Sequence, residues 1–469
     1  MLLGFIIAYL VLTILIGFWA SRKVKTTQDF VIAGRGLPMA LAATALFATW
    51  FGSETIMGAS SEFVEGGLLA VIKDPYGAAL CLFLVGRFFA RPLYRLNILT
   101  FNDFFKQRFS RRTELISAIF MVPSYFGWIA AQLVAMAVIL HTLTGISLPM
   151  GVSVCATIVV LYTYVGGMWA VSITDFIQSI MILVGMLVLA GSMYQQVGGF
   201  QPLIDSQPDG FFRFVPHWEG SSIALYISAW ITVGLGSIPQ QDVFQRVMAA
   251  RSAPTAVNAS YLAAFMYATI GSIPLFIGLC GHYLYPEIQG GEAQMTIPLI
   301  VLQHSSMALQ ILFFGALLSA ILSTTSGAML APATVIGENI VKYYFKNLTD
   351  KGLLRIMRFS IVAVAVCSAA MALRESNIYH LAEVSSSLSL VSLFIPLTAG
   401  LYWKQASERG AVLSILAGMV TWGIFSWMEI DFPANIPGTL ASLASMIIGS
   451  LAWPDTSKAT FDAWQEGRE

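Results

Sequence analysis

The sequence predicts an all-α protein that crosses a lipid bilayer about thirteen times. Of its 469 residues, 57% are hydrophobic and 11% are charged, whereas soluble domains contain about 25% charged residues. Its apolar runs reach about 20 residues, the length at which a helix spans the hydrocarbon core. The formal net charge is zero, which argues against a nucleic-acid partner. The expected surroundings are therefore a lipid bilayer.

The expected spans follow one another along the chain in order. The first is followed by Arg22 and Lys23, whereas a signal peptide carries its charge before the apolar run, so we expect an uncleaved helix. The ninth is too long for one simple span and is expected to include an interfacial lead-in. The runs are 3–20, 38–60, 72–96, 114–141, 148–166, 170–194, 222–245, 256–284, 297–339, 353–373, 379–402, 410–428 and 434–453.

Basic residues gather in alternate loops, and this pattern sets the expected orientation. Loops rich in Lys and Arg stay in the cytoplasm, so we expect the N-terminus outside and the C-terminus inside. The expected location is the plasma membrane, or the inner membrane of a Gram-negative cell. The basic loops contain Arg22, Lys23, Lys25, Arg35; Arg91, Arg95, Lys106, Arg108, Arg111, Arg112; Arg246, Arg251; Lys342, Lys346, Lys351, Arg355, Arg358; and Lys404, Arg409.

The sequence gives no sign of enzyme chemistry. Cys81, Cys155, Cys280 and Cys367 lie singly in apolar runs without CxxC spacing, which is typical of small core residues. No HExxH, GxSxG or Walker-type run occurs. We therefore expect a protein that is not an enzyme.

The second apolar run contains a stretch that does not suit a continuous lipid-facing helix. Residues 46–58 read LFATWFGSETIMG, with glycine, hydroxyls and Glu54 at mid-depth. A carboxylate at a helix centre costs about 2.5–3.5 kcal/mol on insertion scales, so it is expected to face protein, water or a ligand. We interpret the stretch as a broken helix whose free carbonyls line a polar cavity. The alternative is a packed glycine contact with a carboxylate near the interface.

A second interruption occurs five spans later. The segment 234–242 reads GLGSIPQQD and carries two glycines and Pro239 at depth. Interrupted helices at matching positions of two halves are the sequence sign of an inverted repeat.

A third polar stretch lies in the ninth run. Residues 316–328 read ALLSAILSTTSGA, and positions three and four apart share a helix face. The Ala320 carbonyl and the Ser323 and Thr324 hydroxyls would therefore converge. Uncharged oxygens of this kind suit a hard cation. The alternative is a small-residue packing face, which is common between membrane helices.

Several runs, in this order and spacing, resemble the sodium:solute symporter family along nearly the whole chain. They are Asp29–Arg35, Ala48–Gly58, Tyr164–Gly167 with Thr174, Asp175 and Gln178, and Leu322–Ser326 with Glu338 and Asn339.

The resemblance implies a leucine-transporter-like fold with discontinuous helices. One helix precedes two inverted five-helix repeats, expected at 38–194 and 222–402, and two helices follow at 410–453. It also implies Na⁺ as the coupled ion, bound by the carbonyls of Ala48, Phe51 and Ala320 and the hydroxyls of Ser323 and Thr324. Asp175 matches an acidic position near the sodium exit path. Its alternative role is that of a carboxylate at a helix N-terminus.

Within the family, the chain is most similar to the choline-transporter branch. The shared runs are Ala48–Gly52, Phe89–Pro92, Gly236–Pro239 and Phe244–Val247. In that branch aromatic side chains cage a quaternary ammonium, and Trp50 and Trp128 fall on two cage positions. Gln240 stands where the branch has tryptophan, and a late aromatic position is lost near Ala382 and Glu383. Half a cage weakens a choline assignment.

Further solute contacts are expected at both breaks and at the third span. Glu54 could balance a cation or carry a proton, and Gln240 and Gln241 follow the second break. Lys73 and Asp74 could pair with each other, meet the two charges of a zwitterion, or form an interfacial pair. Trp50 could contact the solute or simply pack.

These observations favour a sodium-coupled symporter that imports a small polar organic solute, an amino-acid-like zwitterion or an organic cation, by alternating access. The alternative from another class is a transporter-like membrane sensor that signals through a partner protein. A membrane enzyme is disfavoured, because the sequence offers no nucleophile–base or metal set.

Overall fold

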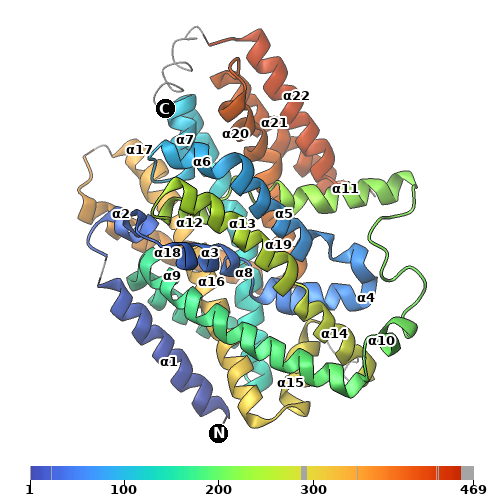
Figure 1. Cartoon of the computed structure of the whole chain (residues 1–469). Coiled ribbons are helices and arrows are strands. Elements are labelled where there is room, and N and C mark those ends of the chain that lie inside the picture. Colours follow the sequence, from blue (N-terminus) through green and yellow to red (C-terminus); the bar gives the residue numbers. More distant parts are fainter. Residues whose placement is uncertain are drawn as a thin grey trace.

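The computed structural model is a bundle of α-helices in which many membrane-length segments are interrupted (Figure 1). It describes residues 2–22, 24–286, 293–345, 347–375, 377–428, 430 and 432–455. Lys23 and Lys346, used above to predict orientation, lie outside these residues. Within the described ranges, the extended pairing consists of a bridge between Leu37 and Ala250.

The helices, in chain order, have the following bounds. They are α1 (Leu2–Ser21), α2 (Thr27–Ile32), α3 (Met39–Ala48), α4 (Ser60–Ala70), α5 (Ala78–Leu84), α6 (Ala90–Arg95), α7 (Phe101–Arg108), α8 (Arg111–Thr144), α9 (Leu148–Val197), α10 (Gln201–Asp205), α11 (Gly220–Gly234), α12 (Gln241–Ala249), α13 (Ala253–Ile270), α14 (Ile273–Leu284), α15 (Thr296–His304), α16 (Met307–Val335), α17 (Lys342–Tyr344), α18 (Asp350–Ala372), α19 (Ile378–Ser389), α20 (Ile395–Tyr402), α21 (Glu408–Trp427) and α22 (Asn435–Ala452). Short 3₁₀ turns occupy Ala33–Arg35 and Ala293–Met295, and π-helical segments occupy Glu54–Ala59, Ile72–Gly77, Val85–Phe89, Ile336–Val341 and Leu390–Phe394.

The core of the bundle is formed by α8 and α16, which pack against each other and against α9. Most of α8 is buried, because its apolar residues face other helices on nearly every side. The first helix, α1, lies at the edge against α9 and α16, and α21 pairs with α22 (Figure 1).

The expected count of thirteen spans is not confirmed. The described residues contain nine helices that are long and apolar enough to cross a bilayer. Three of the expected runs contain shorter apolar helices, Met39–Ala48, Leu148–Leu161 and Gly220–Gly234. Counting runs of apolar residues assumes continuous helices, whereas the chain breaks after Met39–Ala48 and after Gly220–Gly234.

Two further expected spans are joined into one bent helix. The runs 148–166 and 170–194 form α9, which bends at Gly167, where φ is 60° and ψ is −177°. A side chain there would press on Phe30, so this close approach requires glycine. The long run 297–339 divides at Ser305 and Ser306 into α15 and α16.

Both expected interruptions are present. Helix α3 ends at Ala48, and a turn leads to the π-helical segment that begins at Glu54. Helix α11 ends at Gly234, and a turn through residues 235–239 leads to α12. Such breaks release backbone groups that need partners, and they are tolerated where protein or a polar cavity surrounds them.

The second break is pressed against α19 through a glycine. A Cβ on Gly236 would overlap the carbonyl oxygens of Thr232 and Ser386. The turn can therefore touch α19 only because no side chain projects from this residue.

We expect Gly236→Ala to destabilise the protein by about 1–3 kcal/mol, the usual cost of overpacking, as measured by thermal unfolding in detergent. Gly191→Ala in α9 is the matched control, because a Cβ there meets nothing within 4 Å. Equal melting temperatures for the two variants would contradict the close approach.

Candidate functional site

The first break lies directly against α16. The Thr324 hydroxyl donates a hydrogen bond of 3.0 Å to the Ala48 carbonyl, a group that the break withdraws from regular helix. Phe51 lies in the same turn, and Ala320 lies one helical turn before Thr324. The packing-face alternative for α16 describes Ser326 better, because its hydroxyl donates to the Ser323 carbonyl of its own helix.

Ser323 is oriented by a buried carboxylate on α9. Its hydroxyl donates to Asp175 at 2.7 Å and lies 3.2 Å from the Thr174 hydroxyl. Asp175 stands well inside α9, eight residues after the bend at Gly167, so the helix N-terminus does not explain it. Because the Ser323 proton points to Asp175, the lone pairs of its oxygen remain available to another partner.

An arginine completes this buried network. Arg246 on α12 is fully buried, and its Nη2 lies 3.9 Å from Asp175 Oδ2. The guanidinium also donates to the Ala45 carbonyl at 3.0 Å and to the Asp242 carbonyl at 3.2 Å. The arginine therefore ties α12 to α3, immediately before the break, and to α9.

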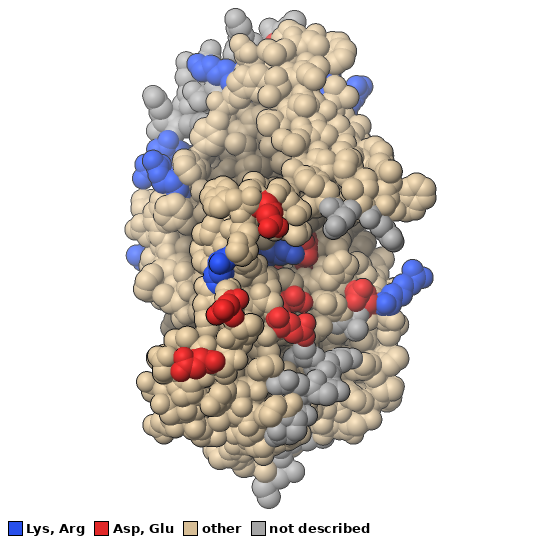
Figure 2. Space-filling view, turned by 90° about the vertical axis from the view of Figure 1, so that its right-hand side faces the viewer, with Lys and Arg blue, Asp and Glu red and all other residues tan. Residues whose placement is uncertain are grey.

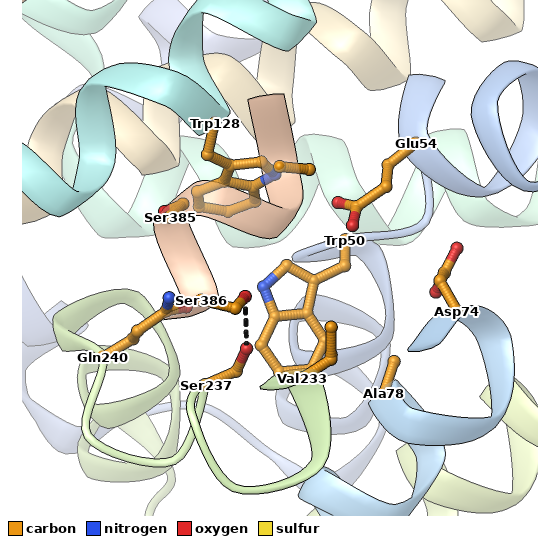
Figure 3. Close-up of a pocket in the computed structure, with 11 residues that line it drawn as sticks. Trp50, Glu54, Asp74, Ala78, Trp128, Val233, Ser237, Gln240, Ser385 and Ser386 are labelled. Atoms are coloured by element: carbon orange, nitrogen blue, oxygen red, sulfur yellow. Dashed lines mark hydrogen bonds between the residues drawn. The ribbon is translucent and has the colours of Figure 1, made fainter. Parts of the chain in front are cut away.

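A cavity opens beside the first break. Five of the residues predicted to contact a solute line it, from four different segments of the chain (Figure 3). They are Trp50, Glu54, Asp74, Trp128 and Gln240. The remaining lining residues are Ala78, Val233, Ser237, Ala382, Ser385 and Ser386.

The cavity is narrow in this conformation. The volume open to the centre of a water-sized sphere is about 10 Å³, roughly the room one water molecule needs. The hydroxyls of Ser237 and Ser386 lie 3.1 Å apart and join the second break to α19 across one side (Figure 3). A larger solute therefore requires the surrounding segments to move apart.

Lys73 and Gln241 lie outside this cavity. Lys73 does not pair with Asp74; its ammonium lies 2.7 Å from Glu383 and 5.6 Å from the Tyr379 ring centre. It lines a neighbouring pocket, here called the vestibule, together with Glu62, Tyr379 and Glu383. The Gln241 side chain accepts a hydrogen bond of 2.6 Å from the Phe101 backbone.

Sequence reasoning missed several polar lining residues. Ser385 and Ser386 belong to the run Ser385–Ser387 inside an apolar span, and this run is the signal that could have identified them. Ser237 stands within the second break, three residues before Gln240.

The oxygens between the first break and α16 suit a cation that is bound by uncharged groups. Among the described residues, no group of three or more His, Cys, Asp or Glu could hold a metal ion. The oxygens gathered between the first break and α16 are carbonyls and hydroxyls.

A sequence model of the sodium:solute symporter family matches residues 30–418.

The chain belongs to the sodium:solute symporter family. It is 27% identical to the high affinity choline transporter 1 of Homo sapiens, over 88% of this chain and 75% of the relative. It is 26% identical to the osmoregulated proline transporter OpuE of Bacillus subtilis (strain 168), over 97% of this chain and 95% of the relative. The expected similarity to choline transporters is thus confirmed.

Solved structures agree with the fold. A Na⁺-coupled sialic acid symporter in a substrate-bound outward-open state superposes with a TM-score of 0.85 at 19% identity, covering 97% of this chain and 98% of that one. MhsT, in complex with L-phenylalanine, superposes with a TM-score of 0.59 at 13% identity, covering 89% of this chain and 98% of that one. The predicted leucine-transporter-like fold with discontinuous helices is confirmed.

Membership of the family establishes the general function of the protein. The protein is a multi-pass transporter of the plasma membrane and not an enzyme, and it couples transport of a small solute to sodium.

We expect Arg246→Ala to lower stability by about 3–5 kcal/mol, because it leaves the Asp175 carboxylate buried without its cation. Thermal unfolding in detergent measures the loss. Arg251→Ala, an exposed arginine five residues later, controls for removal of positive charge. A loss no larger than that of the control would show that the buried pair contributes no stability.

Proposed function

We propose that this protein imports a small polar organic solute, an organic cation or an amino-acid-like zwitterion, together with Na⁺ by alternating access. Sodium would bind between the first break and α16, and the solute would bind in the cavity beside it. The observation that carries the proposal is that the proposed sodium ligands and a wall of the cavity belong to the same turn. Ala48 and Phe51 flank Trp50, whose side chain lines the cavity.

The sodium ligands we propose are the carbonyls of Ala48, Phe51 and Ala320 and the hydroxyls of Ser323 and Thr324. Oxygen ligands of a hard cation of this size stand about 2.3–2.6 Å from it in calcium sites. Two oxygens 3.0 Å apart, as in Thr324 and Ala48, can therefore share one ion. Asp175 would orient Ser323 through its 2.7 Å hydrogen bond and receive sodium on its way out.

The solute contacts we propose are Trp50, Glu54, Asp74, Trp128 and Gln240. Sodium would fix the turn between Ala48 and Phe51 and so position Trp50 against the solute. This links the two sites, because sodium can drive transport only if it binds one conformation better than the other.

The driving force is sufficient for concentrative uptake. One sodium ion entering down about 100 mV gains about 2.3 kcal/mol, and a tenfold gradient adds about 1.4 kcal/mol. Their sum, about 3.7 kcal/mol, corresponds to roughly a 500-fold accumulation of a neutral solute.

The chain would be built from two inverted repeats, 38–194 and 222–402, with the helices of 410–453 outside them, and one group of helices would rock against the other. Support comes from the breaks after Ala48 and Gly234, which fall in the first span of each half. The basic loops favour an N-terminus outside and a C-terminus in the cytoplasm.

The function is tested by uptake of labelled organic cations, zwitterions and carboxylates into proteoliposomes under an inward sodium gradient. Accumulation that collapses when potassium replaces sodium supports the proposal. Ligand binding without uptake of any solute would favour a sensor instead.

We expect Ser323→Ala combined with Thr324→Ala to raise the sodium concentration for half-maximal uptake at least tenfold, because a lost hydrogen-bonding partner of a charge costs about 1.5–3 kcal/mol. Thr325→Ala is the matched control, since the Thr325 hydroxyl bonds the Ile321 carbonyl of its own helix. An unchanged sodium dependence in the double variant would exclude the site.

We expect Trp50→Ala to weaken solute binding at least tenfold and sodium binding much less, because its ring forms a cavity wall. Trp427→Ala, at a side chain that is 86% exposed, is the control. Equal losses for solute and sodium would mean that Trp50 acts by packing against Tyr267, whose ring centre lies 6.4 Å away.

A further inference from the structure

The central cavity contains two carboxylates and, among the residues the structure describes, no basic side chain in its lining. Glu54 is 8% exposed and Asp74 is 1% exposed. They come from different parts of the chain: Glu54 opens the π-helical segment after the first break, and Asp74 lies in the segment Ile72–Gly77. Figure 3 shows both on the same side of the cavity, next to Trp50.

The neighbouring lysine does not neutralise this pair. The Lys73 side chain lines the vestibule instead, and its ammonium lies 2.7 Å from Glu383. A charge that could compensate Asp74 is thus paired with a different carboxylate. Uncompensated charge inside a membrane protein is costly and is kept where it meets a substrate, an ion or a proton.

A second observation points to a ligand with hydrogen-bond donors. The Oδ2 atom of Asp74 is buried and has no hydrogen-bond partner among the described residues. An ionised carboxylate can only accept hydrogen bonds. Ser237, Gln240 and Ser386 add further oxygens to the lining. The cavity therefore offers many acceptors beside two aromatic walls.

We propose that the solute is an organic cation that carries N–H groups, a primary or secondary ammonium or a guanidinium, held by Glu54 and Asp74 between Trp50 and Trp128. This inference rests on the proposed function and narrows its solute class. The N–H groups donate to the carboxylates, and the indole faces stabilise the positive charge by cation–π attraction.

The same geometry disfavours a quaternary ammonium. Such a cation has no N–H, so it would cover the buried Asp74 oxygen without giving it a hydrogen bond, and a buried acceptor left without a partner is destabilising. A site built to hydrogen-bond its substrate rejects the analogue that lacks the donor by about 10⁴–10⁵. Carboxylate solutes are disfavoured by repulsion from both acids.

The neighbouring vestibule also contains carboxylates. Glu62 and Glu383 line the vestibule, with Lys73 the accompanying base. Figure 2 shows acidic side chains, with basic side chains among them, around a hollow on the face where α4, α10 and α14 lie in Figure 1.

The test measures binding of a series that differs only in N-methylation: ethanolamine, N-methylethanolamine, N,N-dimethylethanolamine and choline. Sodium-dependent thermal stabilisation and titration calorimetry of the purified protein report affinity, with propylamine, putrescine, agmatine, β-alanine and propionate alongside. We expect affinity to fall at least tenfold from ethanolamine to choline. Tightest binding of choline, binding confined to β-alanine or propionate, or binding of no member of the panel would overturn the proposal.

Variants separate recognition from stability. Asp74→Asn and Glu54→Gln are expected to weaken ethanolamine at least tenfold while changing choline little, an asymmetry that a general loss of structure would not produce. Glu65→Gln, an exposed carboxylate on α4, is the control, and sodium-dependent stabilisation reports correct folding. Equal losses for both ligands would overturn the proposal.

Failure of the solute class is distinguishable from failure of the function. Sodium-driven uptake of a zwitterion or of choline would refute the amine assignment and leave symport standing. Absence of sodium-driven uptake for every solute would refute the proposed function itself.

Discussion

The candidate site depends on one constraint: where a helix breaks inside the apolar bundle, its free backbone groups need new hydrogen-bond partners. Breaking α3 after Ala48 releases carbonyls where no water is available to solvate them, a cost of several kcal/mol if they stay unpaired. The Thr324 hydroxyl meets one of them at 3.0 Å. A carbonyl held by a hydroxyl rather than by its own helix can exchange that partner for a cation. The break is thereby stable in the protein and still available to an ion.

The other features of the site follow from where that break is held. Arg246 fixes α12 to the end of α3 through the Ala45 carbonyl and reaches toward Asp175, and Asp175 orients Ser323 on α16. On the other side of the turn, Trp50 forms a wall of the cavity. The proposed sodium ligands and the proposed solute cavity therefore share a few residues of backbone, which is the structural requirement for one ligand to affect binding of the other.

Much of this could be predicted from the sequence, because the signals were local. Glycine and hydroxyls at mid-depth marked the first break, glycines and Pro239 marked the second, and the hydroxyl cluster marked the face of α16 that meets the first. Relationships between distant segments could not be predicted. The pairing of Lys73 with Glu383 joins residues 310 positions apart, and local proximity to Asp74 gave no hint of it. Gln241 follows Gln240 directly, yet its side chain points elsewhere and accepts a hydrogen bond from the Phe101 backbone. The count of thirteen spans is not confirmed for a related reason, since apolar composition does not record where a helix is interrupted.

The central claim is that sodium and solute bind on two sides of one short turn, and their energetic linkage tests it most directly. The dissociation constant of a transported solute should be measured at saturating sodium and with potassium in its place, and that of sodium with and without the solute. The account predicts that each ligand tightens the other by the same factor, at least fivefold, as reciprocal coupling requires. Affinities that do not depend on the other ligand would contradict it.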